Sequence, residues 1–180
     1  MSQTALADDK RDAEELLKSK LDSVFAVLQK KDLDQQVKNN EIIGIVTPMF
    51  DFALMAKLSL GRKYWPNLPQ GKKERFTELF IKRLRTSYLH KLALYTNEKI
   101  TFEPPTQVKT KVHISTFLVS KSRKTSMLYK LYKSKDDWKI YDLEIQGVSI
   151  IRSYRSQFEA SLQSGTIDDL LLKLVKPADN

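Results

Sequence analysis

The sequence predicts an α+β protein in which helices precede and follow a four-stranded antiparallel sheet. The spacing of the apolar residues and the turns between the strands support this fold class. Apolar residues recur with a helical period up to about residue 92, with a period of two between residues 100 and 145, and with the helical period again from Ser149 onward. Short polar turns separate the strands, and such turns join antiparallel neighbours, because parallel strands need long crossover connections.

The first helix is predicted over residues 12–28 and the second over residues 32–46. In the first helix the charged residues Lys18, Lys20 and Asp22 fall outside a single apolar stripe. This pattern is typical of an amphipathic helix that buries one face. The stripe consists of Ala13, Leu16, Leu17, Leu21, Val24, Phe25 and Leu28.

Thr47 and Pro48 predict the start of a third helix, as N-cap and first helical residue, with Asp51 in the first turn. Gly61 predicts its end. After a loop over residues 64–69, we expect a long helix. Its buried stripe consists of Phe76, Leu79, Phe80, Leu84, Tyr88 and Leu92, with Tyr95 near the end.

Four strands are expected in the middle of the chain. The first, around residues 100–102, ends at Pro104 and Pro105, because proline cannot donate to the ladder of a sheet. Turns over residues 121–124 and 133–137 separate the others. The second strand is expected to place Val108, Val112, Ile114 and Leu118 on one face, the third contains Met127, Tyr129 and Leu131, and the fourth spans residues 138–145.

Two helices are predicted after the sheet. The first begins at Ser149 and ends at Gly165. Thr166 predicts the N-cap of the second, with acidic residues in its first turn. The residues expected to be buried are Ile150, Ile151, Tyr154, Phe158 and Leu162 in the first helix, and Leu170, Leu171 and Leu174 in the second.

The composition predicts one globular domain over residues 8–176, with short tails at residues 1–7 and 177–180. The chain has 180 residues, of which 41% are hydrophobic. That is enough for a core and too apolar for a disordered chain. The chain has no Cys, which excludes disulfides, a Cys nucleophile and Cys-based metal sites. We expect a monomer.

The positive charge is concentrated in two blocks. The chain has 31 Lys and Arg against 22 Asp and Glu, a net charge of +9. Residues 62–91 carry nine basic residues against two acidic ones, and residues 99–139 carry ten against three, so each block has a net charge of +7. Two interpretations remain open: solvated faces of a helix and a sheet, or a docking surface for an anionic partner.

The residue types that catalysis and metal binding require are not arranged in recognisable motifs. His90 and His113 lie far apart, so we expect no metal and no cofactor. Gly147 and Ser149 lack the following glycine of a nucleophile elbow. The sequence therefore predicts a protein that is not an enzyme.

Nucleic-acid binding is the competing interpretation of the charge. Basic and aromatic residues alternate over residues 130–133 and 152–155, as they do in proteins that bind single strands. Tyr154, however, lies on the apolar stripe of its helix, and no nucleic-acid motif is present. We therefore expect no nucleic-acid partner.

Targeting signals are sparse. The most apolar stretch, residues 42–60, is interrupted by a proline and two charged residues, so it is a poor candidate for a membrane span. Ala5-Leu6-Ala7 has the small-x-small form of a signal-peptidase site, although no apolar segment precedes it. Residues 1–7 are thus interpreted as a remnant of a removed signal peptide or an added tail, with chance as the alternative.

Two stretches of the sequence have a specific order and spacing. The first is VTPMFDFALMAKLSLG over residues 46–61, followed by Trp65, Phe76 and Tyr88. The second is DWKIYDL over residues 137–143, followed by GVS at 147–149, YRSQF at 154–158 and Gly165. This arrangement resembles the toluene-tolerance family over roughly residues 10–175. One departure is Leu68-Pro69-Gln70-Gly71, where the family usually has a Ser-Pro-Glu-Gln-type cap.

The resemblance implies a helical layer over a curved sheet, like the cone of nuclear transport factors, with an internal apolar cavity. It also implies a periplasmic phospholipid-binding protein of the lipid-asymmetry transport system. Such a protein exchanges diacyl phospholipid with an outer-membrane lipoprotein–porin complex and with the MCE-domain subunit of an inner-membrane ABC transporter. Direct contact with the membranes is transient. The alternative is a domain of the same fold that binds another apolar ligand.

On this resemblance, apolar and aromatic residues of the helices and the sheet are expected to line the lipid pocket. The alternative for each is a place in an ordinary core. The candidates are Phe50, Phe52, Met55, Phe80, Leu84, Tyr88, Tyr95, Val112, Ile114, Met127, Tyr129, Leu131, Ile140, Tyr141, Leu143, Ile151 and Tyr154. A docking surface is expected at Lys72, Lys73, Arg75, Lys121, Arg123 and Lys124. Asp51 and Arg155 are expected to form structural hydrogen bonds and not to contact a headgroup.

Overall fold

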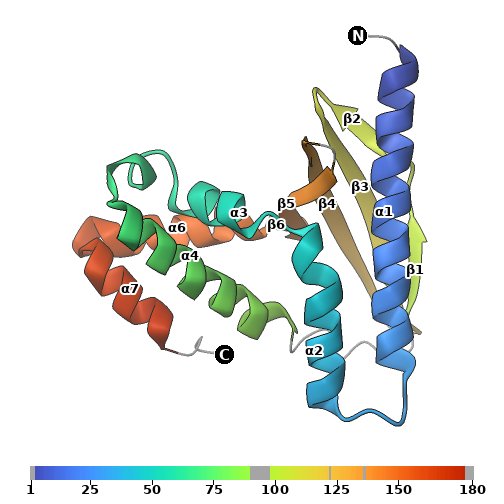
Figure 1. Cartoon of the computed structure of the whole chain (residues 1–180), viewed down its shortest axis with the longest axis horizontal. Coiled ribbons are helices and arrows are strands. Elements are labelled where there is room, and N and C mark those ends of the chain that lie inside the picture. The colour runs from blue at the N-terminus through green and yellow to red at the C-terminus, as the bar shows by residue number, and fades with distance from the viewer. Residues whose placement is uncertain (1–2, 90–97, 122, 136, 177–180) are drawn as a thin grey trace. The chain divides into compact units, whose positions relative to one another are not determined.

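The computed structural model describes residues 3–89, 98–121, 123–135 and 137–176, which form two compact units (Figure 1). Met1–Asp51 and Ala93–Gly147 make up the first, which we call the sheet unit. Phe52–Leu92 and Val148–Asn180 make up the second, which we call the helical unit. The tail predicted at residues 177–180 lies outside the described residues, and the single domain over residues 8–176 stays a prediction.

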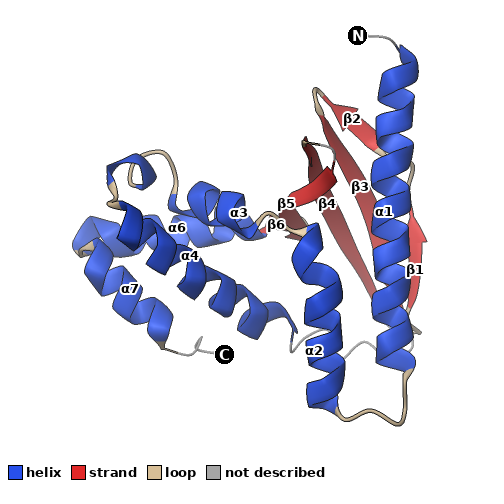
Figure 2. Ribbon diagram, in the orientation of Figure 1, coloured by secondary structure: helices blue, strands red, loops and turns tan. Residues whose placement is uncertain are grey.

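The sheet unit combines two helices with an antiparallel sheet whose strands run in the order β1-β3-β4-β5, and β2 pairs with β3 (Figure 2). Its helical segments are α1 (Gln3–Gln29), α2 (Gln35–Val46) and the 3-10 turn η1 (Thr47–Met49). Its strands are β1 (Lys99–Phe102), β2 (Thr106–Val108), β3 (Lys111–Val119), β4 (Lys124–Ser134) and β5 (Asp137–Ile145).

The helical unit contains α-helices and two short helical turns of other types (Figure 2). Its α-helices are α3 (Phe52–Leu60), α4 (Gln70–Leu84), α6 (Ile150–Ser164) and α7 (Ile167–Val175). Its other elements are the 3-10 turn η2 (Trp65–Asn67), the π-helix η3 (Arg85–Leu89) and the two-residue strand β6 (Val148–Ser149).

The predicted α+β class is confirmed, and local signals account for several of its boundaries. The hydroxyl of Ser149 accepts a hydrogen bond from the Arg152 amide at 3.1 Å and caps α6. Thr166 and Asp169 form a reciprocal capping box at the start of α7. Hydrogen bonds from the backbone and hydroxyl of Thr166 hold the pKa of Asp169 below its ordinary value. Gly61 follows α3 with a φ of 82°, as the predicted helix end requires.

The predicted helix start at Pro48 is wrong. Residues 47–49 form only a 3-10 turn, and α3 begins at Phe52. Between them, Phe50 bridges to Ile140 in parallel, and the Asp51 amide donates to the Ile140 carbonyl at 2.9 Å. This extended pairing with β5 interrupts the helix that the local sequence favours.

The predicted second strand also differs from the structure. Val108 belongs to β2, which turns at Lys109 and pairs with the start of β3, where Val108 is opposite Lys111. Val108 is therefore exposed and does not share the buried face of Val112 and Ile114. The four predicted strands correspond to β1, β3, β4 and β5, and α1 begins at Gln3, earlier than expected.

The core of the sheet unit lies on one face of the sheet, which we call the inner face. Along β3 the side chains of Val112, Ile114, Thr116 and Leu118 are buried, and the intervening residues are partly exposed. Helix α1 packs on this face (Figure 1): the Lys18 ammonium lies 5.1 Å from the centre of the Phe102 ring, and Phe102 is opposite the buried Thr116. None of the described helices is long and apolar enough to cross a bilayer.

Candidate functional site

Most of the predicted lining residues of the sheet unit gather on its inner face. Register places Val112 opposite Leu131, and Leu131 opposite Ile140. Two residues further along β3, Ile114 is opposite Tyr129, and Tyr129 is opposite Leu143. All six are buried, and Met127, opposite Thr116, is partly exposed. The period-two pattern thus brings seven candidates together, and six of them form packed core.

Two hydroxyl groups lie within this apolar face. The Tyr129 hydroxyl donates to the Met127 sulfur at 3.6 Å, and burial raises the pKa of Tyr129 well above its ordinary value. The side chain of Thr116 is also buried, and its hydroxyl acts in the opposite direction, lowering the pKa of Tyr129 through a side-chain hydrogen bond. The inner face therefore contains polar groups on strands whose inward-facing residues are otherwise mostly apolar.

Tyr141 does not join the other candidates. A bulge in β5 shifts the register, so that Lys130 is opposite Asp142 and Leu131 is opposite Ile140. Tyr141 falls between these pairs and lies on the opposite, outer face. There the centre of its ring lies 6.1 Å from the centre of the Tyr132 ring, and its hydroxyl lies 3.5 Å from Nε2 of His113. The Lys111 ammonium lies 4.4 Å from the centre of the Tyr141 ring.

The helical unit contains a cluster of aromatic residues. Phe80 meets Tyr154 edge-on at 5.3 Å, and Phe158 packs edge-on against Phe76 at 5.3 Å. Phe76 and Phe158 were not among the predicted lining residues, although both lie on the apolar stripes of their helices. The candidates Met55, Phe80, Leu84, Ile151 and Tyr154 are all buried.

Three further candidates are only partly buried: Phe50 in the sheet unit, and Phe52 and Tyr88 in the helical unit. Tyr88 lies in the π-helix η3, an element frequent at functional sites. Burial, with a smaller contribution from Tyr154, raises the pKa of Tyr88 to about 12. Tyr95 lies outside the described residues.

The outer face of the sheet holds an ion cluster that no sequence motif indicated. The ammonium of Lys130 lies 3.1 Å from a carboxylate oxygen of Asp142 and 2.5 Å from one of Glu144. Burial lowers the pKa of Lys130, but hydrogen bonds and charge from Glu144 and Asp142 outweigh it, so the pKa is raised. The pKa of His113 is lowered, mainly by burial and then by the charge of Lys130.

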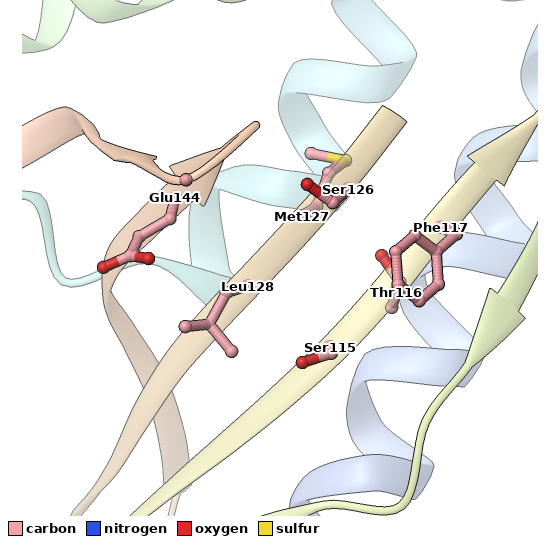
Figure 3. A pocket seen from close by; sticks show the side chains of 8 residues that line it. Ser115, Thr116, Phe117, Ser126, Met127, Leu128 and Glu144 are labelled. Carbon is pink, nitrogen blue, oxygen red and sulfur yellow. The ribbon is translucent and has the colours of Figure 1, made fainter. Parts of the chain in front are cut away.

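A depression of about 190 Å³ lies on the sheet, and its polar side includes Ser115, Ser126 and Glu144 (Figure 3). Its other lining residues are Thr116, Phe117, Met127, Leu128 and Gly147. A diacyl phospholipid needs a cavity on the order of 1,000 Å³. The depression is therefore too small to hold one.

The residues predicted to form a docking surface have different surroundings. In the helical unit, Lys72 pairs with Asp168 at 2.8 Å, and Arg75 pairs with Glu78 at 3.3 Å. The Lys73 ammonium lies 5.9 Å from the Trp65 ring centre. At the turn between β3 and β4, Lys121 and Arg123 are exposed, and the Lys124 ammonium lies 3.9 Å from the Phe117 ring centre. The described residues include no cluster of three or more metal-ligating side chains.

Comparison with known proteins adds to this geometry. The family model described as MlaC protein matches residues 18–176. A phospholipid-binding protein from Ralstonia solanacearum, solved in complex with a phospholipid, has a similar structure with a TM-score of 0.78 and 23% sequence identity. The alignment covers 92% of this chain and 99% of that one. Among curated proteins, none matches the chain significantly in sequence.

Proposed function

We propose that this chain, which belongs to the MlaC protein family, is a phospholipid carrier that moves lipid between the two membranes of a bacterial envelope. The single observation that carries the proposal is the family match over residues 18–176, nearly the whole chain. The fold is consistent with it, because the structurally similar Ralstonia protein is named for phospholipid binding.

The physical basis of carriage is burial of the acyl chains. Burying one CH₂ group is worth about 0.8 kcal/mol, so two chains with about 30 such groups represent roughly 24 kcal/mol before costs. A lipid held in this way does not escape into water on a useful timescale. Hand-off must therefore follow an apolar path at a docked partner.

Within each unit, partly buried apolar side chains are the best candidates for contact with acyl chains, because a fully packed side chain has no free surface. These candidates are Phe50 and Met127 in the sheet unit, and Phe52 and Tyr88 in the helical unit. Met suits a lining that accepts chains of different shape. The buried candidates would contact lipid only if the packing around them opened.

The proposed setting is the periplasm. The proposed partners are an outer-membrane lipoprotein–porin complex and the MCE-domain subunit of an inner-membrane ABC transporter. Membership of the family supports both parts of this proposal, and the carrier itself performs no covalent chemistry in this role. The charged docking residues Lys121 and Arg123 are exposed, as contact with such partners requires.

The decisive experiment is to purify the protein from a bacterial host, extract it with organic solvent and analyse the extract by mass spectrometry. We expect diacyl phospholipid in stoichiometric amount. A different apolar molecule in its place would favour another ligand for the same fold. A lipid-free protein that takes up none from vesicles would contradict the proposal.

A matched pair of variants tests the location of the lipid. Tyr88→Ala, at a candidate contact, should lower the bound phospholipid several-fold. Tyr141→Ala, on the outer sheet face, should leave it unchanged, although the same group is removed from a partly buried position. Thermal unfolding of both variants distinguishes lost binding from lost folding.

A further inference from the structure

The charge of the protein is divided unequally between its two units. The helical unit contains 14 Lys and Arg and 6 Asp and Glu, which gives a net charge of +8. The sheet unit contains 17 Lys and Arg and 16 Asp and Glu, which gives a net charge of +1. The helical unit therefore carries almost all of the excess, whereas the sequence alone suggested two equal basic blocks.

Helix α7 of this unit exposes apolar side chains. Leu172 is 66% exposed and Val175 is 50% exposed, while Leu170 and Leu174 on the opposite side are buried. Residues three apart lie on neighbouring positions of one helix face. The exposed pair thus forms an apolar ridge on the outside of the protein.

Cations lie around the C-terminal end of this ridge. Lys173 is exposed on α7 itself, and Lys176 is exposed directly after its last residue. Arg83 of α4 lies at the same end, because its Nη2 donates to the carbonyls of Lys173 and Lys176 at 2.9 and 2.8 Å. The acidic residues of α7 lie at the other end, where Asp168 pairs with Lys72 and Asp169 serves the capping box.

The ridge is presented by a well-fixed helix. The capping box holds its first turn, and Arg83 binds its last carbonyls. Helix α7 lies beside α4, which is the source of Arg83 and Lys72 (Figure 1). A surface ligand would therefore meet Leu172 and Val175 without ordering the helix first, which lowers the cost of binding.

We propose that the C-terminal half of α7 together with the residue that follows it, Leu172 to Lys176, docks on the surface of an anionic phospholipid bilayer. Aliphatic side chains flanked by lysines suit the boundary between headgroups and acyl chains, since the apolar atoms enter and the ammonium groups remain at the phosphates. A second copy is disfavoured by the repulsion between two units of +8. The inference goes beyond lipid carriage and does not depend on it.

Vesicle flotation with the full chain tests the proposal. Phosphatidylcholine vesicles with about 30% phosphatidylglycerol should carry the protein upward at low salt, and pure phosphatidylcholine vesicles should carry about tenfold less. High salt should weaken flotation on the anionic vesicles. Absence of flotation on anionic vesicles, or equal flotation on both kinds, would overturn the proposal.

Variants locate the docking site. Leu172→Ser with Val175→Ser should reduce binding about tenfold or more, because two aliphatic side chains no longer enter the bilayer. Lys173→Glu with Lys176→Glu should reduce it at least as much and flatten the salt dependence. Val37→Ser and Lys31→Glu change exposed residues of the sheet unit and serve as matched controls. Equal losses in controls and α7 variants would contradict the assignment to α7.

The same samples separate docking from lipid carriage. Protein that extracts labelled phospholipid yet stays at the bottom of the gradient would disprove docking and leave the carrier function intact. Protein that floats without extracting lipid would support docking and count against carriage. Binding to an acidic protein with no vesicle binding would replace the bilayer by a protein partner and overturn the proposal.

Discussion

The guanidinium of Arg155 donates two hydrogen bonds to the carbonyl oxygen of Leu58, from Nε at 2.9 Å and from Nη2 at 2.6 Å. Leu58 lies in the last turn of α3, where carbonyl groups have no partner within the helix. The positive charge is also favourable at a helix C-terminus. Arg155 therefore fastens α6 to the end of α3, which agrees with the structural role predicted from sequence.

We expect Arg155→Ala to lower the free energy of unfolding by about 2 kcal/mol, because a hydrogen bond from a charged group to a helix end is lost. Arg155→Lys should recover only part of this, since an ammonium cannot reproduce the planar pair of donors. Denaturant unfolding measures both. Arg62→Ala, at an exposed arginine of the same unit, is the control, and an equal loss there would show that the effect is not specific.

Arg83→Gln should selectively loosen the end of α7. Arg83 donates to the carbonyls of Lys173 and Lys176, so its removal leaves both without this partner and costs about 1–2 kcal/mol. Amide hydrogen exchange should become faster in α7 and stay unchanged in α3. Lys82→Gln removes the exposed neighbouring charge as a control, and uniform faster exchange in both variants would contradict a local role.

The sequence predicted those features that local chemistry determines. Ser149 and Thr166 are N-caps whose partners lie three residues away, and the alternation along β3 identifies its buried face. The missed features depend on contacts distant in sequence or on unusual backbone. Lys109 turns the chain at a φ of 58°, a conformation that glycine or asparagine usually marks in a sequence. Because neither is present, the pattern predicts Val108 as part of one long strand.

The candidate site shows the same limit. Alternation could not reveal the bulge that turns Tyr141 to the outer face, because the bulge is a mismatch between two strands and leaves no period of its own. Lys130, Asp142 and Glu144 come together only through the register of β4 and β5. Pairings of this kind require the topology, which the pattern of a single strand does not contain.

His113 should make stability depend on pH. Its folded pKa is lowered, mainly by burial and by Lys130 and Lys111, while Glu144 and Asp142 oppose the shift. His113 therefore binds a proton more readily in the unfolded chain than in the folded one. The stability that neutral His113 contributes is fully present above the ordinary pKa of about 6.5 and is lost as the pH falls below it. Unfolding measured across pH should show a slope in this window that His113→Gln removes. An unchanged slope in the variant would assign it to other groups.

Breaking the Lys130 cluster should cost far more than breaking a surface ion pair. Lys130→Met leaves two largely buried carboxylates without their cation, and we expect a loss of about 3 kcal/mol in the free energy of unfolding. Lys133→Met on the same strand removes an exposed pair with Asp9 and should cost less than about 1 kcal/mol. Adding Asp142→Asn and Glu144→Gln to Lys130→Met should restore part of the stability, because the uncompensated charges are gone. Urea denaturation compares the three proteins, and a further loss in the triple variant would show that the carboxylates contribute through contacts other than the pairing with Lys130.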